Sequence, residues 1–311
     1  VYAADLYRDT IVVINPQSGQ VIERFKTGRR PYRILFHPDG MSFLVSSWAD
    51  GAVLHHDAAS GKILARIRLA AHTTDMVWRP GEVEFEEGGP RFVARLFVAA
   101  ANTNTVQVIG VSETNELRAV EGVNISLTPF QPAGMTPSAL ALSADGNRLY
   151  VACSDANAVA VVDVSEARSR VIGFIPTGLY PTAVRSLADG RLVVLNGKGG
   201  RSWPSRARHA GLLETGTASF IEPFDDEALE AYTKTVFENS PYRDSILQDA
   251  GAGEGNPIPA TPGDPSPIEH VIYIVKENRT YDQVLGDVKE GNGDPSLALF
   301  GEEVTPNHHR L

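Results

Sequence analysis

The stretch GMTPSALALSADGNRLYVACSDANAVAVVDV, residues 134–164, contains the pattern that decides the fold. Gly134 is followed three residues later by Pro137 and eleven residues later by Asp145-Gly146. Two apolar segments, LYVA and VAVVDV, come next and are separated by the polar segment SDANA. Apolar segments bounded by Asn, Asp, Gly and Ser predict strands joined in hairpins, and Asp-Gly pairs suit tight turns.

The same register recurs along the first two thirds of the chain. The other clear copies are Gly28…Pro31…Asp39-Gly40 and Gly178…Pro181…Asp189-Gly190. A worn copy, TTDMVWRPGE, has Thr73 in place of the first proline, and its Pro80 matches Pro38. Each copy leads into strand-like segments, and VYAADLYRDTIVVINP at the start of the chain has the same hairpin pattern.

The unit is therefore strand-turn-strand-turn-strand, and its last two copies are 44 residues apart. A period near 40–45 residues with about four strands per unit is typical of a β-propeller. A β-sandwich would have short strands too, but no fixed Gly-x-x-Pro…Asp-Gly register. We expect a mainly β fold with four to five blades over residues 1–224, incomplete at the N-terminal side. The register resembles that of the YVTN-repeat β-propeller family.

Composition excludes several classes of protein. Hydrophobic residues make up 42% and charged residues 21% of the 311 residues, which is ordinary for a globular chain. The net charge of −10 argues against a nucleic-acid-binding protein. The one cysteine, Cys153, excludes an internal disulfide framework. No apolar run reaches the ~20 residues of a membrane-spanning helix. The chain starts without methionine, and we expect that it is truncated at both ends.

A helix and a linker are expected after the repeats. DDEALEAYTKTVFENSP has helical periodicity, with Asp225 or Asp226 as cap and Asn239 near the end. Residues 251–267 are rich in Gly and Pro and read as a linker, so residues 225–267 form a connecting region. The basic segment Arg201–His209 could meet an anionic substrate, but a solvated loop is the favoured reading. Gly197-Lys198-Gly199 lacks the spacing of a P-loop.

A second domain is expected from Ile268 to Leu311. The apolar run Val271–Val275 predicts a strand buried on both faces of an α/β sheet, and it leads into Glu277, Asn278 and Arg279. Thr280 and Gln283 have capping-box spacing and predict a helix start. Polar residues at the carboxyl end of such a strand lie where open α/β sheets bind ligands.

The sequence IEHVIYIVKENRTYDQVLGD resembles the opening motif of the phosphoesterase family that includes phospholipase C and acid phosphatase enzymes, relatives of the alkaline phosphatase superfamily. A YVTN-type propeller followed by this domain matches a known bifunctional arrangement. The resemblance implies a metal-dependent phosphoric ester hydrolase, with Glu277 and Asn278 as ligands of a divalent metal ion and a phosphate ester as substrate. It also implies a periplasmic or extracellular location. The nucleophile and the other ligands come later in that family, so we expect these 311 residues alone to be inactive.

Each candidate residue also has a structural reading. Arg279 could pair with a substrate phosphate or with a nearby carboxylate. Thr280 could be a nucleophile, but the capping role already accounts for it. Asn307, His308 and His309 are weak candidates as ligands or acid/base groups. Three further histidines, one of them near Asp75, are expected to be structural or exposed: His55, His56 and His72.

Two other functions remain open. The propeller could be a non-catalytic module that binds a cell-envelope partner, or it could itself be catalytic, as in lactone-hydrolysing propellers. Fold alone does not decide between these functions.

Overall fold

The computed structural model describes residues 1–200, 215–240, 242–247, 255–259, 263–275 and 277–311. It divides into two compact units. One comprises Val1–Arg201 and Thr215–Asp244, and the other Ser202–Glu214 and Ser245–Leu311. The basic segment Arg201–His209 of the sequence analysis lies outside the described residues.

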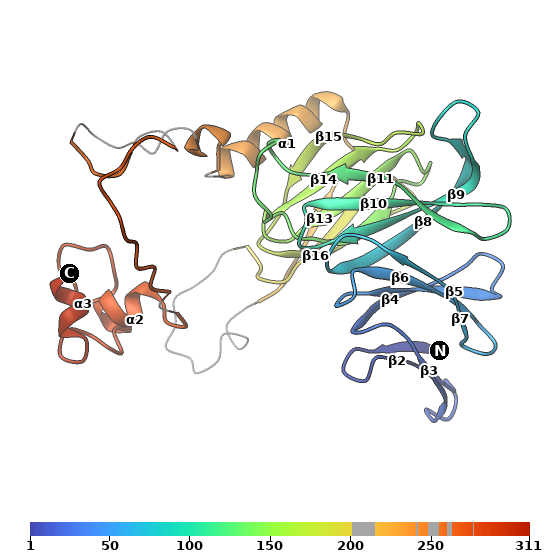
Figure 1. The fold of residues 1–311 in the computed structure, drawn as a ribbon, viewed down its shortest axis with the longest axis horizontal. Helices are drawn as coiled ribbons and strands as arrows, with labels where there is room; N and C mark the ends of the chain where they lie inside the picture. Colours follow the sequence, from blue (N-terminus) through green and yellow to red (C-terminus); the bar gives the residue numbers. More distant parts are fainter. Residues whose placement is uncertain (201–214, 241, 248–254, 260–262, 276) are drawn as a thin grey trace. The chain divides into compact units, whose positions relative to one another are not determined.

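The first unit is mainly β and consists of five antiparallel sheets, called blades 1 to 5 in chain order (Figure 1). Blade 1 has three strands, β1 (Tyr2–Asp5), β2 (Thr10–Ile14) and β3 (Val21–Lys26); blade 2 has β4 (Pro31–Phe36), β5 (Ser42–Ser47), β6 (Ala52–Asp57) and β7 (Ile63–Arg68); blade 3 has β8 (Thr73–Glu84), β9 (Arg91–Ala100), β10 (Thr105–Val111) and β11 (Leu117–Asn124); blade 4 has β12 (Pro137–Leu142), β13 (Arg148–Cys153), β14 (Ala158–Asp163) and β15 (Arg170–Pro176); blade 5 has β16 (Pro181–Ser186), β17 (Leu192–Asn196) and β18 (Thr217–Ile221). The predicted mainly β propeller fold is confirmed.

The Asp-Gly pairs form the turns between the first and second strands, as predicted. Gly40, Gly146 and Gly190 all have positive φ, from 69° to 87°, which glycine adopts without steric cost. The worn copy has no Asp-Gly pair and no turn at this position. There β8 continues through Pro80 and Gly81 to Glu84, with a register shift against β9 between Pro80 and Val83.

Neighbouring blades pack through their apolar faces and through side-chain hydroxyls. The first strands of blades 2 to 5 contact one another in order. Ser46 of blade 2 donates to the carbonyl of Thr74 (2.5 Å), and Thr74 donates to that of Pro137 (3.1 Å). Ser138 of blade 4 donates in turn to the carbonyl of Pro181 (3.2 Å). These bonds satisfy polar groups where the blades meet.

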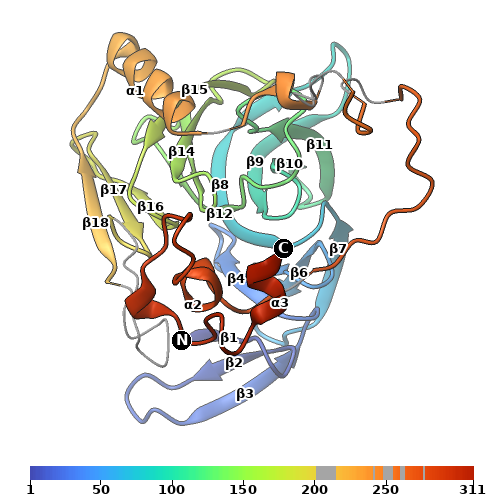
Figure 2. The ribbon, with the colours of Figure 1, turned by 90° about the vertical axis from the view of Figure 1, so that its left-hand side faces the viewer.

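The predicted helix is α1 (Asp226–Asn239), and it packs on β15 of blade 4 (Figure 2). Asp225 caps it, accepting a hydrogen bond from the Ala228 N–H at 2.9 Å. Close packing requires Gly173, because a Cβ there would lie within 2.9 Å of the Leu229 and Thr233 side chains. The helix therefore belongs to the first unit rather than to a free connecting region.

In the second unit, the described elements are three short helices and parts of the loops between them. They are α2 (Tyr281–Leu285), the 3₁₀ helix η3 (Pro295–Leu297) and α3 (Pro306–Arg310); a further 3₁₀ helix, η2 (Asp244–Leu247), spans the boundary between the units. The prediction of a buried strand at Val271–Val275 is wrong for this structure. The run is irregular and its side chains are 71–88% exposed.

The physical reason is the lack of a pairing partner. A buried strand needs neighbours on both sides for its N–H and C=O groups. Among the described residues of the second unit there is no other strand. Within the described part of the chain, no helix is both long and apolar enough to cross a membrane.

Candidate functional sites

The structure places several predicted site residues around one small pocket, the Glu277 pocket. It has a volume of about 220 Å³ and is lined by Glu277, Arg279, Thr280, Tyr281, Val284, Leu285, His308 and Leu311. The Arg279 guanidinium lies 4.9 Å from the centre of the Phe300 ring, so its plane is partly supported by an aromatic face. The pocket thus combines a carboxylate, a guanidinium, a hydroxyl and an imidazole.

Thr280 is the N-cap residue of α2, as the sequence predicts. Its backbone N–H donates to Gln283 Oε1 at 3.4 Å, which is one half of a capping box. Asn278 has a left-handed backbone (φ 72°), is exposed and does not line the pocket. The structure therefore separates Asn278 from its neighbour Glu277.

The fit of these residues to a divalent metal can be tested from their chemistry. A carboxylate and an amide oxygen are hard donors of the kind that Mg²⁺ or Ca²⁺ takes, but such ions take about six or more oxygen ligands. In the described part of the chain, no group of three His, Cys, Asp or Glu residues could hold a metal ion. Glu277 and Asn278 have the right donor type and too few partners, so their metal role stays a prediction.

The adjacent histidines of α3 point in different directions. His308 lines the Glu277 pocket, whereas His309 pairs with Asp287, with Nε2 and Oδ1 2.9 Å apart. His309 Nδ1 lies 2.9 Å from the Thr305 carbonyl oxygen. Both ring nitrogens thus face acceptors, and the Asp287 carboxylate raises the pKa of His309. His309 therefore has structural partners at both ring nitrogens and is not a free acid or base. Asn307 also lies on α3 but does not line the pocket.

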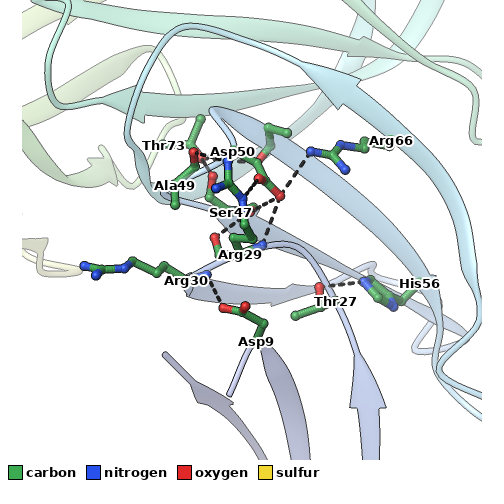
Figure 3. A network of polar contacts seen from close by, with 11 residues as sticks. Asp9, Thr27, Arg29, Arg30, Ser47, Ala49, Asp50, His56, Arg66 and Thr73 are labelled. Carbon is green, nitrogen blue, oxygen red and sulfur yellow. Dashed lines mark hydrogen bonds and ion pairs between the residues drawn. The ribbon is translucent and has the colours of Figure 1, made fainter. Parts of the chain in front are cut away.

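His55 and His56 are structural, as expected. Both are buried on β6, and burial lowers the pKa of each. His56 Nδ1 donates to the Gly61 carbonyl at 2.9 Å, so its Nε2 accepts from the Thr27 hydroxyl at 3.0 Å (Figure 3). These contacts hold the ring within blade 2 and against Thr27, which directly follows β3 of blade 1.

A second candidate site lies where the first strands of blades 2 to 5 begin. The residue immediately before each of these strands has a left-handed backbone. These four pre-strand residues are Arg30 (φ 52°), His72 (φ 59°), Thr136 (φ 51°) and Tyr180 (φ 58°). Each carbonyl accepts a hydrogen bond of 2.8–3.0 Å from the backbone N–H that follows the second strand of its blade. The fold thus presents one side chain per blade at an equivalent position.

Three of these loops are also held by the preceding blade. Asp9 Oδ1 accepts from the Arg30 N–H at 2.8 Å (Figure 3). Asn104 accepts from Met135 at 2.8 Å, and Asn157 accepts from Tyr180 at 2.8 Å. At the corresponding position before β6 the chain has Gly51, which has no side chain to bond the loop of His72. At the contact between blades 2 and 3, the chain therefore departs from the repeat twice. Thr73 replaces the proline, and Gly51 replaces the Asp or Asn residue.

His72 packs instead against Trp48. The imidazole and indole rings stack at 3.8 Å with an angle of 4°, and the Arg30 guanidinium lies 5.7 Å from the indole centre. The His72 side chain is held by this stacking and has no hydrogen-bond partner among the described residues. Its Nδ1 atom is buried. In blade 5, the Lys198 ammonium lies 4.5 Å from the Tyr180 ring centre.

Charged residues also lie near the start of β4 and of β8, close in sequence to the pre-strand residues. Arg33 pairs with the buried Asp75 at 3.1 Å. Partial burial, and then the Asp75 carboxylate and Tyr180, raise the pKa of Tyr32. Asp75 of blade 3 and Tyr180 of blade 5 thus both act on Tyr32 of blade 2.

Sequence reasoning missed this second site. It treated His72 as structural or exposed and did not consider Trp48. A signal was available: in the three clear Gly-x-x-Pro copies the residue before the proline is Arg30, Thr136 or Tyr180, all with polar side-chain groups. Their left-handed conformation could not be read from residue types that usually avoid it.

Known structures share the fold of the first unit. The chain aligns over 71% of its length with 68% of a "putative 6-phosphogluconolactonase" from Bacteroides uniformis, at 14% identity and a TM-score of 0.51. It also aligns with the β-propeller domain of Cps50 (Swd1) from Myceliophteria thermophila, over 63% and 60% of the two chains, at 14% identity and a TM-score of 0.46. A Bacteroides fragilis structure of the same description as the first has 20% identity, a TM-score of 0.43 and coverage of 58% and 52%.

The likeness to the Bacteroides uniformis structure agrees with the β-propeller fold. Comparisons with protein-family models and with curated protein sequences gave no match. The phosphoesterase resemblance of Ile268–Leu311 therefore stays a prediction from the sequence.

Proposed function

We propose that this protein is a hydrolase of the propeller-lactonase type, which opens a cyclic ester at the pre-strand residues. The observation that carries the proposal is His72, an imidazole held on Trp48 without a hydrogen-bond partner in the described part of the chain, with Arg30 over the same indole. The lactonase description belongs to a protein of the same fold at 14% identity, and the proposal extends it to this chain.

The chemistry that these side chains could supply is general-base hydrolysis. His72 would accept a proton from water, and the hydroxide so formed would attack the ring carbonyl carbon. The ring C–O bond would then break, and the imidazolium would return the proton to the leaving alkoxide, giving a hydroxy acid. The Arg30 guanidinium would stabilise the negative charge that develops on the carbonyl oxygen.

The test is hydrolysis of a sugar δ-lactone, corrected for the spontaneous reaction, by the wild type and by His72→Phe. Phenylalanine retains a flat ring over Trp48 and removes both nitrogens. We expect kcat to fall at least about 100-fold with little change in KM, the range typical of a lost general base. Arg24→Ala, an exposed change on β3, is the control. Equal turnover by wild type and His72→Phe would contradict the proposal, and no turnover by either would favour a binding module.

A second candidate function is hydrolysis of a phosphate ester, favoured by the shared lining of the Glu277 pocket. Glu277, Arg279, Thr280 and His308 come together there although His308 is 28 residues or more from the other three. The test is turnover of an aryl phosphate monoester and diester, with and without a chelator, by the full-length protein and by its Glu277→Gln variant, because residues 1–311 alone are expected to be inactive. Activity that the chelator and the substitution both abolish would support this function. Lactone hydrolysis without any phosphate release would argue against it.

A further inference from the structure

The hairpin of β8 and β9 is longer than its counterparts in blades 2 and 4. β8 has 12 residues and β9 has 10, whereas β4, β5, β12 and β13 have six each. The extension carries Phe85 and Phe92, whose ring centres lie 6.1 Å apart at an angle of 70°. Phe92 is 4% exposed and lies over Gly110 of β10, where a Cβ would be 2.6 Å from the ring. The aromatic pair therefore has a fixed place beside blade 3.

Two arginines come to this aromatic pair from other segments. Arg118 lies on β11, the outer strand of blade 3, and Arg168 lies in the loop between β14 and β15 of blade 4. The Arg168 guanidinium is 5.5 Å from the centre of the Phe85 ring, and its Nη1 donates to the Val120 carbonyl at 3.4 Å. One guanidinium is thus supported by an aromatic face and by the backbone of the neighbouring blade.

The backbone around Arg168 is also held. Val120 is the extra residue of a β-bulge in β11, and bulges are common beside functional sites, where they redirect side chains. Ser169, the next residue after Arg168, donates its N–H (3.0 Å) and its hydroxyl (2.7 Å) to the Glu121 carboxylate. Blades 3 and 4 are therefore joined directly beside Arg168.

These side chains line one cavity of about 110 Å³, the Phe85 cavity. Its apolar wall includes Phe85, Pro90 and Phe92, and its charged residues are Arg118, Arg168 and Glu86. All three charged residues are exposed, and none of them has an ion-pair partner in the described part of the chain. The lining therefore carries one net positive charge at a mouth that is open to solvent.

The size of the Phe85 cavity limits what it can hold. Pockets for cofactors and other larger ligands usually have about 300 Å³ or more. An apolar cavity of about 150 Å³ takes one benzene ring. The Phe85 cavity is open at its mouth, so one planar ring can enter it and leave a substituent outside, among the guanidinium groups.

We propose that the Phe85 cavity binds a small aromatic monocarboxylate. The ring would lie against Phe85 and Phe92, and the carboxylate would accept charge-assisted hydrogen bonds from Arg118 and Arg168. Glu86 would repel a second negative charge on the ligand. The cavity shares no residue with the pre-strand residues or with the Glu277 pocket, so this inference is independent of both proposed activities.

The test measures binding of benzoate to the whole chain by saturation-transfer NMR at low ionic strength, because salt screens exposed charges. Benzamide has the same ring without the charge, and acetate has the charge without the ring. We expect benzoate to bind at least about 5-fold more tightly than either of them. Equal affinity for benzoate and benzamide, or no saturable binding of benzoate, would overturn the inference.

Variants of the charged residues test the site itself. Arg118→Gln and Arg168→Gln should each weaken benzoate binding at least about 3-fold, and Glu86→Gln should strengthen it about 2-fold. The matched control is Arg170→Gln, because Arg170 is 77% exposed, lies two residues from Arg168 and does not line the cavity. Thermal melts check that every variant is folded. Affinity that is unchanged in both lining arginine variants, or that falls equally in Arg170→Gln, would show that benzoate does not bind in this cavity.

Discussion

At the scale of single residues, His309 shows how a histidine can be structural and charged. Its side chain is 8% exposed, and both ring nitrogens face oxygen acceptors, the Asp287 carboxylate and the Thr305 carbonyl. A neutral imidazole could donate to only one of them. When the ring is protonated, it can donate to both oxygens at once and hold α3 against the loop of Asp287.

We predict a pH window for the stability of this contact. The pKa of His309 is raised from 6.5, so its contribution is full below pH 6.5 and is lost as pH rises through the folded pKa. The pKa of Asp287 is lowered from 3.8, so its contribution is present above pH 3.8 and is lost as pH falls through the folded pKa. The check is an NMR titration of the His309 ring with thermal melts from about pH 5 to about pH 9. His309→Gln should flatten the alkaline loss, and His308→Gln should not.

Arg95 is a buried arginine that bonds two blades without a carboxylate partner. Its side chain on β9 is 1% exposed and donates to the carbonyls of Val164 (2.5 Å), Glu166 (2.7 Å) and Ala167 (3.3 Å) in the loop after β14. Burial, with a smaller contribution from Arg79, lowers the pKa of Arg95 to about 10, so the side chain is still charged at neutral pH.

We predict that Arg95→Met lowers the free energy of unfolding by about 2–4 kcal/mol, because three carbonyls lose their donors and methionine cannot replace them. Urea unfolding gives the value. The control is Arg91→Ala on the same strand, whose exposed side chain pairs with Glu84 at 3.4 Å. It should change stability by no more than about 0.5 kcal/mol. Similar losses in both variants would mean that the contacts of Arg95 with blade 4 do not matter.

At the scale of elements, the sequence predicted local structure well where one residue determines it. The cap at Asp225, the helix to Asn239, the turns at Asp-Gly pairs and the helix start at Thr280 are all present. In each of these features, a capping side chain or a glycine determines the conformation of the backbone next to it. Val271–Val275 failed because an apolar run becomes a strand only with partner strands, which its own residues do not specify.

The candidate sites were harder to predict for a related reason. Glu277 and His308 share a pocket through the fold of residues between them, which no spacing rule describes. His72 and Trp48 stack at the blade contact where Gly51 stands in place of the Asp or Asn of blades 1, 3 and 4. The repeat was visible in the sequence. The stacking of His72 on Trp48 in its irregular copy could be found only from the backbone geometry.

The cap of α1 gives a prediction at this scale. Asp225→Ala removes the acceptor of the Ala228 N–H, and we expect a loss of about 1 kcal/mol. Amide exchange should increase in the first turn of α1, because the packing of Leu229 and Val236 still holds the rest of the helix. Lys234→Ala, which removes only an exposed pair with Glu238, is the control and should have little effect. No change in exchange after loss of the cap would show that packing alone holds the helix.

At the scale of the whole propeller, stability depends on polar contacts that pass from blade to blade near the first strands. Hydroxyls of one blade bond the first strand of the next, and Asx residues bond its pre-strand loop. Asp75 makes such polar contacts with both neighbouring blades. The carboxylate on β8 accepts from Leu140 of β12 at 3.0 Å and pairs with Arg33 of β4 at 3.1 Å. One buried side chain thus joins blades 2, 3 and 4.

We predict that Asp75→Asn weakens three blades at once. The amide retains the shape but not the charge, so Arg33 loses its partner and one acceptor oxygen becomes a donor facing an N–H. Because the Arg33 side chain is 43% exposed, water offsets part of the loss, and we expect about 1–2 kcal/mol. Hydrogen exchange should rise in β4 and β12 as well as in β8. Asp145→Asn, in the turn after β12, should affect blade 4 alone. Faster exchange confined to β8 would mean that Asp75 supports only its own strand, and that the blades are coupled through their apolar faces instead.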